Sequence, residues 1–196
     1  MTQIKIGIDL DNTIINYENS FEKYLQEKKI YFKKINKRKI KLITNNNSKI
    51  KNWTEAQEEI YGHYITYAKL YKNFNEFEKF ALKNKIKLYI ISHKTKYSQF
   101  SKKYNLRSES DRWLKENIIK NKYKIFYVNT INEKVRKIAK IKPDYFIDDL
   151  IEIFDNKNFP KKVKKILFSK INNNEVVTFG NWDKIKNYIN KNETFK

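Results

Sequence analysis

The stretch IGIDLDNTI, residues 6 to 14, begins as an apolar run and ends in two carboxylates one residue apart, Asp9 and Asp11, with Thr13 close behind. A short, continuous apolar run is typical of a strand that is buried on both faces of a parallel sheet. Charged groups are costly inside a core, but open parallel sheets bind ligands just outside the carboxyl ends of their strands. The stretch therefore predicts a first core strand whose end carries functional carboxylates.

Further apolar runs along the chain have the same strand character. With the first run, at residues 4–9, those at 86–92 and 144–148 end in a small polar or acidic group. KIFYVN contributes a fourth strand at 125–129, and a fifth is expected at 163–169. Polar groups that recur where buried strands end indicate one shared site at the carboxyl edge of a sheet.

Helix start signals lie between these runs. Asn75 with Glu78 precedes FEKFALK, Ser110 precedes DRWLKENI, and Thr130 with Glu133 forms a capping box before KVRKIAKI. Strand followed by helix, repeated along the chain, predicts an α/β fold with a doubly wound parallel sheet.

One segment interrupts this alternation. Residues 14–91, between Thr13 and Ser92, are too many for a single crossover helix. Residues 17–26 have a helical pattern, a basic run follows at 33–41, and the asparagine run at 45–47 is expected to be a loop. Thr54 with Gln57 forms a second capping box before EAQEEIYGHYITYAKL. A small helical insert after the first strand explains the extra length.

The composition restricts the possible kinds of site. The chain has no Cys and only two His, which excludes disulfides and thiolate metal sites and leaves too few imidazoles for a typical zinc centre. A metal would therefore be held by oxygen ligands, which favours Mg²⁺. No stretch has the length of a membrane span, and the N-terminus lacks the pattern of a signal peptide, so we expect a soluble cytoplasmic protein.

The formal net charge is +21, from 43 Lys and Arg against 22 Asp and Glu. Such a charge suggests nucleic acid or another anionic partner. Arg, the better residue for bidentate contacts with phosphates and bases, occurs only at positions 38, 107, 112 and 136, and Lys is spread along the whole chain beside abundant Asn and Ile. We therefore assign the excess charge to composition rather than to nucleic-acid binding, with electrostatic steering of an anionic substrate as its consequence.

A second acidic pair, Asp148 and Asp149, follows the apolar run at 144–148. If this pair and the carboxylates of Asp9 and Asp11 share one crevice, they repel one another and raise one another's pKa unless a cation lies among them. Mg²⁺, bound through carboxylates and completed by waters and a substrate phosphate, fits this set of ligands. Asp is fully ionised near neutral pH, so Asp9 needs no base to act as a nucleophile, and a neighbouring second carboxyl suits general acid and base work.

Four features follow one another along the chain: the DLDNT motif, the strand-ending Ser92, a Lys upstream of the last acidic pair, and the Asp148-Asp149 pair. They occur in the order of the four motifs of the haloacid dehalogenase-like (HAD) superfamily. The chain resembles this superfamily over residues 4–155. The resemblance implies a phosphatase with an HAD-like Rossmannoid core. Asp9 would form an aspartyl-phosphate, and Asp11 would protonate the leaving oxygen and then activate water.

The same resemblance implies roles for the other motif residues. Ser92, Lys134 and Thr13 would bind the phosphate, with Lys137 as the alternative lysine, and Thr13 would also order the turn. The Mg²⁺ ligands would be Asp9, Asp148, Asp149 and, through its backbone carbonyl, Asp11.

The insert resembles a C1-type cap, which implies a cap at 17–71 and a catalytic core at 1–16 and 72–196. Such a lid selects the leaving group. His93 and Lys94, directly after Ser92, are the predicted substrate contacts, and the cap offers further candidates. These are Trp53, Gln57, Tyr61, His63 and Tyr64, although aromatic residues at helical spacing are more often part of a core.

Together with these motifs, the chain contains the stretches SHKTKY, DRWL, FIDDL and NWDKI. The whole set looks like that of small HAD-like phosphatases of bacterial surface-polysaccharide and nucleotide-sugar pathways. This likeness implies a small phosphorylated metabolite as substrate, such as a sugar phosphate or a phosphorylated amino alcohol or amide. Two alternatives stay open: a 5′-nucleotidase-like phosphatase, and a non-catalytic nucleic-acid-binding protein. A receiver-type phosphoacceptor domain also uses clustered Asp and Lys, but the DxD on the first strand and the large insert argue against it.

Overall fold

The computed structural model describes residues 3–30, 42–43, 49–50, 52–118 and 123–195, so the basic run at 33–41 and the asparagine run at 45–47 lie outside the described residues. The chain forms two compact units. The first comprises Met1–Ile15, Leu70–His93 and Ile118–Lys196, and the second comprises Asn16–Lys69 and Lys94–Asn117. None of the helices in the described ranges is long and apolar enough to cross a membrane.

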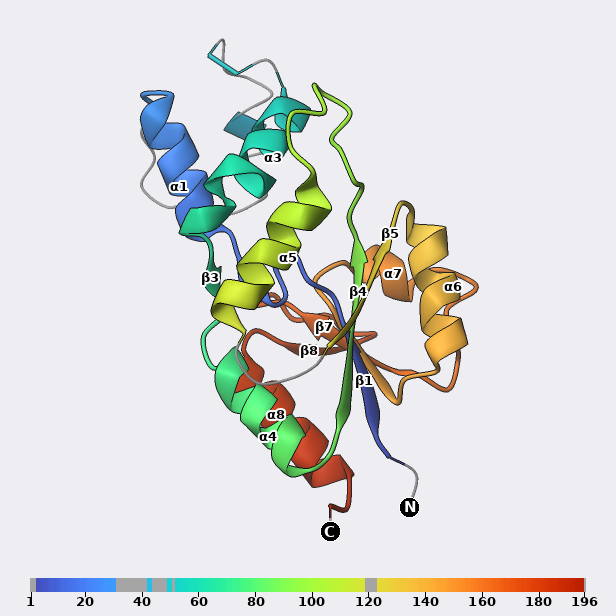
Figure 1. Cartoon of the computed structure of the whole chain (residues 1–196). Coiled ribbons are helices and arrows are strands. Elements are labelled where there is room, and N and C mark those ends of the chain that lie inside the picture. Colours follow the sequence, from blue (N-terminus) through green and yellow to red (C-terminus); the bar gives the residue numbers. More distant parts are fainter. Residues whose placement is uncertain (1–2, 31–41, 44–48, 51, 119–122, 196) are drawn as a thin grey trace. The chain divides into compact units, whose positions relative to one another are not determined.

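The first unit is built on a parallel sheet with the order β5-β4-β1-β6-β7-β8. Its strands are β1 (Lys5–Ile8), β4 (Lys87–His93), β5 (Lys124–Val128), β6 (Tyr145–Asp148), β7 (Lys164–Phe168) and β8 (Val177–Phe179). All neighbouring pairs run parallel, and β1 lies between β4 and β6 (Figure 1). The five predicted strands are present to within one or two residues at each end, and β8 was not predicted.

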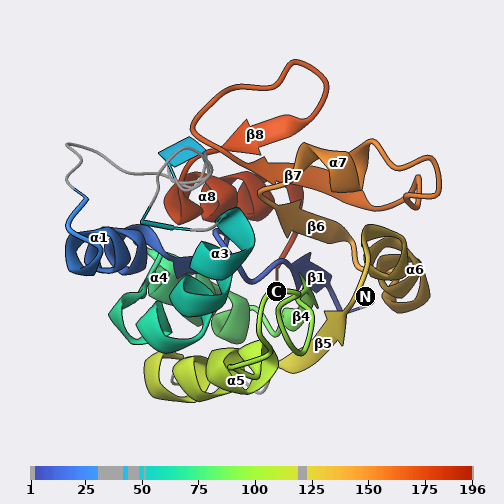
Figure 2. The same ribbon diagram turned by 90° about the horizontal axis from the view of Figure 1, so that it is seen from above.

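Helices cover both faces of this sheet. α4 (Phe74–Lys83) and α8 (Trp182–Asn192) pack together on one face, and α6 (Ile131–Ile141) and α7 (Ile151–Phe154) lie on the other (Figures 1 and 2). The predicted doubly wound α/β fold is therefore confirmed.

The α6 and α7 face holds a continuous apolar cluster that includes Ile91, Ile138, Phe146 and Phe154. The ring of Phe146 lies across Gly7, its partner in the β1–β6 register, so closely that a Cβ atom on Gly7 would meet ring carbon Cδ2 at 2.6 Å. Gly at this position lets β1 pack under a large side chain directly upstream of the DLDNT motif.

The second unit contains α1 (Glu18–Glu27), α3 (Trp53–Tyr61), the 3₁₀ helix η1 (His63–Tyr67) and α5 (Leu106–Asn117). Its buried residues include Phe21, Tyr24, Ile60 and Trp113, and the Trp113 indole donates a hydrogen bond of 3.2 Å to the Ala68 carbonyl oxygen. A two-stranded sheet of β2 (Ile15–Asn16) and β3 (Lys69–Leu70) forms where the chain passes from one unit to the other.

The second unit differs from the division expected from the sequence, since Lys94–Asn117 was assigned to the core and instead belongs to the unit formed by the insert. A contiguous cap was the simplest interpretation of one long interruption. The segment after β4 carries Leu106, Trp113 and Leu114, whose burial joins α5 to the helices of the insert.

Several helix starts also differ from the expectation. α4 follows Asn73, which adopts the left-handed conformation with φ 67°, rather than Asn75. α5 begins at Leu106, so Ser110 lies inside it. α3 is capped by Asn52, whose side chain accepts from the Glu55 amide, and it ends at Tyr61 instead of continuing to residue 70. For α4 and α3 the observed N-cap residue, Asn73 or Asn52, lies two residues before the expected one, and neighbouring polar residues of this kind compete for the same role.

Candidate active site

Asp9 lies at the carboxyl edge of the sheet, directly after β1. Its backbone amide donates to the Ile147 carbonyl oxygen at 2.9 Å, which continues the hydrogen bonding of β1 with β6 for one more residue. Only 5% of the residue is exposed. A buried carboxylate at the end of a central strand costs desolvation energy, so its charge must be compensated.

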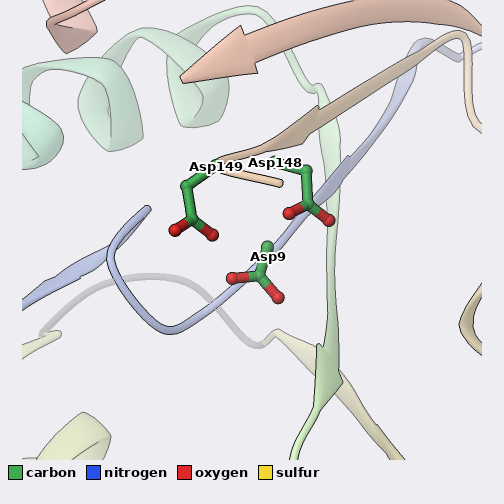
Figure 3. Close-up of side chains that lie close together, drawn as sticks. All are labelled: Asp9, Asp148 and Asp149. Atoms are coloured by element: carbon green, nitrogen blue, oxygen red, sulfur yellow. The ribbon is translucent and has the colours of Figure 1, made fainter. Parts of the chain in front are cut away.

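Asp148 and Asp149 bring two more carboxylates to this place from the end of the neighbouring strand β6. One carboxylate oxygen from each of Asp9, Asp148 and Asp149 lies within 4.8 Å of the other two (Figure 3). Asp148 is fully buried and Asp149 is half-buried. The three side chains expected to hold a cation are therefore brought together.

Asp148 also orders the chain that follows β6. Its Oδ1 accepts a hydrogen bond of 3.0 Å from the Leu150 amide, just before α7. The N-cap residue of α7 is Leu150, which makes no side-chain capping bond. The side chain of Asp149 is thus not used as the helix cap.

Lys134 supplies a cation to the cluster. The predicted capping box forms, because the Thr130 hydroxyl accepts from the Glu133 amide at 3.1 Å and sets the first turn of α6. The Lys134 ammonium, fully buried, lies 2.5 Å from Asp9 Oδ1 and 2.6 Å from Asp148 Oδ2. The alternative, Lys137, places its ammonium over the Phe126 ring at 4.4 Å from the centroid, so Lys134 is the lysine at the carboxylates.

The protonation equilibria of these groups are coupled. Burial raises the pKa of Asp9 to about 7, Lys134 opposes this shift, and the charges of Asp148 and Asp11 add to it. Burial likewise raises the pKa of Asp148. For Lys134, burial opposes the charge, but Asp148 and Asp9 outweigh it and raise the pKa. Asp9 and Asp148 thus compensate part of their charge through one shared ammonium.

Three buried polar side-chain atoms around the motifs have no hydrogen-bond partner among the described residues: Asn12 Nδ2, Thr13 Oγ1 and Ser92 Oγ. Buried polar groups in folded proteins are almost always satisfied, so an unpaired set at one edge of a sheet indicates a missing ligand. The set consists of an amide donor and two hydroxyls, which suits an anion with several oxygens. Asn12 was not among the predicted site residues, although its place inside the DLDNT motif could have indicated it.

Asp11 lies in a turn rather than in an extended strand. β1 ends at Ile8, Asp11 makes an isolated bridge with Ile15, and Asn12 between them adopts φ 61°. Asp9 and Asp11 therefore do not lie on one extended strand. Asp11 is still close enough for its charge to raise the pKa of Asp9.

The two predicted substrate contacts belong to different units, and each has partners within its own unit. The His93 ring places Nε2 at 2.9 Å from the Asn129 carbonyl oxygen, on the side of β5. Lys94 belongs to the second unit, where its buried ammonium donates to Ser110 Oγ at 2.6 Å and to Tyr17 OH at 3.3 Å.

Of the cap candidates, Tyr61 and Tyr64 are buried in the second unit, Trp53 and Gln57 are half-buried, and His63 is exposed. The burial of the two tyrosines fits a place in the core of that unit.

The residues present fit a hard divalent cation. Three carboxylates that converge on one point, two of them buried, offer the oxygen ligands that Mg²⁺ prefers. The ammonium of Lys134 carries one positive charge, whereas Asp9 and Asp148, which it contacts, carry two negative charges when ionised. These side chains could therefore hold a metal ion.

Comparison with known proteins agrees with this architecture. A scan against protein-family models finds no match, and a search of curated proteins finds none either. Among solved structures, the chain is similar to a HAD-superfamily hydrolase from Ehrlichia chaffeensis, with 18% identity over 97% of this chain and 98% of that chain and a TM-score of 0.51. The fold is that of the HAD superfamily.

Two further HAD structures support this assignment. The magnesium-bound HAD-hydrolase YfnB from Bacillus subtilis is 11% identical, with 97% of this chain and 100% of that chain covered and a TM-score of 0.59. An HAD phosphatase from Thermococcus onnurineus is also 11% identical, with 96% and 98% covered and a TM-score of 0.55. The HAD-like core expected from the DLDNT and FIDD motifs is thus confirmed as a fold.

Proposed function

We propose that this protein is a Mg²⁺-dependent phosphomonoester hydrolase that acts through an aspartyl-phosphate. The observation that carries the proposal is the convergence of Asp9, Asp148, Asp149 and Lys134 at the carboxyl edge of an HAD-like sheet, beside buried polar atoms that have no partner in the described part of the chain. A phosphate ester supplies what this place lacks, because its oxygens accept from the donors while a cation compensates the carboxylates.

Asp9 is the proposed nucleophile. A carboxylate oxygen of Asp9 forms a bond to phosphorus while the ester bond to the leaving oxygen breaks, and Asp11 gives that oxygen its proton. In the second half, Asp11 takes a proton from water, the water oxygen bonds to phosphorus and the bond to Asp9 breaks. The product is inorganic phosphate, and both carboxyl groups return to their starting states.

Lys134 has two tasks in this proposal. Its contact with Asp9 Oδ1 fixes the orientation of the nucleophile, and its charge favours the ionised form that attacks. Ser92, Thr13 and Asn12 bind phosphoryl oxygens through the groups that have no partner among the described residues.

Asp9, Asp148 and Asp149, with the backbone carbonyl of Asp11, would hold the metal ion. Bound Mg²⁺ supplies charge stabilisation to the transferring phosphoryl oxygens. Asp148 is itself fixed by its contacts with Lys134 and the Leu150 amide. The proposed metal ligand Asp148 and the proposed nucleophile Asp9 therefore contact the same ammonium.

The second unit is proposed to act as the cap that selects the leaving group. The substrate would be a small phosphorylated metabolite, such as a sugar phosphate or a phosphorylated amino alcohol or amide of a surface-polysaccharide pathway. An anionic substrate is consistent with the positive net charge, because a positive protein surface raises the rate at which anions encounter it.

The direct test is phosphate release from p-nitrophenyl phosphate with Mg²⁺ and with EDTA. We expect Mg²⁺-dependent turnover in the wild type and none above background in Asp9→Asn. Asp144→Asn is the matched control, because Asp144 precedes β6 at the opposite end of the strand from Asp148 and accepts from the Lys5 amide. Equal rates in wild type and Asp9→Asn would contradict the nucleophile assignment.

A panel of phosphorylated metabolites then tests the substrate class. The proposal expects faster turnover of sugar phosphates or phosphorylated amino alcohols than of any nucleotide. Preference for nucleotides across the panel would favour the 5′-nucleotidase alternative instead.

A further inference from the structure

The turn that follows Asp9 is closed by its own backbone. The amides of Ile14 and Ile15 donate to the Leu10 carbonyl oxygen at 3.0 and 2.9 Å, and the Asn12 amide donates to the Ile15 carbonyl oxygen at 2.9 Å. These bonds fix the turn internally, with Asn12 in the left-handed conformation. They do not fix the turn with respect to the rest of the unit.

Two groups from elsewhere in the first unit donate hydrogen bonds to carbonyl oxygens of this turn. The Trp182 indole Nε1 donates to the Thr13 carbonyl oxygen at 3.1 Å, and the Tyr71 amide donates to the Ile14 carbonyl oxygen at 2.9 Å. Trp182 is the only side chain among these donors. It comes from the far end of the chain, 169 residues from Thr13.

Trp182 is itself held rigidly. The side chain is fully buried, and its ring packs against those of Phe77, Phe74 and Phe168 with centroid distances of 4.7, 4.8 and 5.4 Å. It opens α8 directly after Asn181, whose side chain accepts from the Lys184 amide. An indole that is packed among several aromatic rings can hold its hydrogen-bond acceptor in one position.

We propose that Trp182 is a positioning residue for the motif turn: its indole holds the Thr13 carbonyl, and so presents the Thr13 hydroxyl and the Asn12 amide to the phosphoryl group. This inference rests on the proposed function. Both of these polar atoms are buried and unpaired among the described residues, and they belong to the turn to which the Trp182 indole donates. Small displacements of such groups are costly in rate, so a donor outside the site influences turnover.

The kinetic test is Trp182→Phe, which keeps an aromatic ring and removes the indole donor. We expect kcat for p-nitrophenyl phosphate to fall about fivefold to tenfold, the effect of losing one neutral hydrogen bond, while KM stays within about twofold. A purely structural role predicts a lower melting temperature with kcat unchanged in the folded enzyme.

Two control variants separate positioning from packing. Phe77→Leu disturbs the same aromatic cluster without touching the turn, and Trp113→Phe removes the other buried indole donor, whose acceptor Ala68 lies in the second unit. Both should lower the melting temperature and leave kcat within about twofold of the wild type. An unchanged kcat in Trp182→Phe, or an equal loss in Phe77→Leu, would overturn the inference.

A spectroscopic test works without catalysis. In ¹⁵N-labelled protein, the indole signals are assigned by the Trp→Phe variants, and Asn12→Ala then strains the turn, because Ala is disfavoured at φ 61°. The Trp182 indole signal should shift and that of Trp113 should not. A Trp182 signal that stays in place would refute the contact, whereas a wild type without phosphatase activity but with this shift would defeat the proposed function alone.

Discussion

Each unit buries a cluster of polar groups around a carboxylate, and the two clusters are satisfied in different ways. In the second unit, Glu58 is 1% exposed and accepts hydrogen bonds from Ser98 Oγ, from both the amide and the hydroxyl of Ser101, and from the Lys103 amide, at 2.6 to 3.0 Å. In the first unit, Asp9 and Asp148 share the ammonium of Lys134, Asp149 lies beside them, and three neighbouring polar atoms have no partner among the described residues.

This difference distinguishes a buried carboxylate with a structural role from a cluster with a proposed functional role. Although burial alone would raise it, the pKa of Glu58 is lowered by its hydrogen bonds, whereas the pKa of Asp9 is raised because burial outweighs the help from Lys134. A cluster that satisfies itself stabilises the fold. Where buried polar atoms have no partner among the described residues, we infer that the cluster is arranged for a ligand or an ion.

The largest effect is expected from Lys134→Met. Two buried carboxylates would lose their shared cation, so the free energy of unfolding should fall by about 3–5 kcal/mol and turnover should be lost. Lys137→Met is the matched control on the same helix, since that ammonium lies over Phe126, and it should cost less than about 1 kcal/mol. Urea denaturation of both variants gives the comparison, and similar losses would contradict the role given to Lys134.

Glu58→Gln should destabilise the protein by about 2–3 kcal/mol, because several donors lose a charged acceptor and the new amide group faces them. The neighbouring Glu59→Gln, which removes a partly exposed pairing with Lys103, should cost less than about 1 kcal/mol. Folded Glu58→Gln should still turn over p-nitrophenyl phosphate. Loss of turnover in the folded variant would show that the satisfied cluster also serves the reaction.

The contribution of Glu58 to the free energy of unfolding should decrease at acidic pH. Because the folded-state pKa lies below the usual value of 4.5, the stabilisation from Glu58 is fully present above pH 4.5 and is lost as the pH falls through the lowered value. The stability difference between wild type and Glu58→Gln should therefore be constant at higher pH and shrink below that point. Urea denaturation at a series of pH values measures it, and a difference that grows on acidification has the wrong sign for this account.

Helix caps give the smallest and sharpest contrast. Thr130→Ala and Asn52→Ala each remove one capping acceptor, at the starts of α6 and α3, and should each cost about 1 kcal/mol. Only Thr130 caps the helix that carries Lys134, so only Thr130→Ala should also lower kcat in the folded enzyme. Equal kcat values in the two variants would indicate that the first turn of α6 does not position Lys134.

The sequence predicts those features that depend on local pattern. Apolar runs that end in Asp9, Ser92 and Asp148 identify the central strands and the edge where they meet, and the Thr130 capping box places Lys134 correctly. Charge repulsion among strand-end carboxylates was enough to indicate a cation site.

The features that the sequence did not predict depend on tertiary packing. The assignment of α5 to the second unit follows from burial of Trp113, and the placement of Lys94 from Ser110 and Tyr17, which are distant in sequence. The contact of Trp182 with the motif turn joins opposite ends of the chain. None of these partners is specified by periodicity or spacing, which report only on neighbours along the chain.

The central claim is that the carboxylates of Asp9, Asp148 and Asp149 bind a cation, and a measurement of Mg²⁺ binding tests it most directly. Titration calorimetry of metal-free protein should show one Mg²⁺ site in the wild type and in Glu58→Gln, and none in Asp148→Asn. Binding that survives in Asp148→Asn, or no binding in the wild type, would contradict the account.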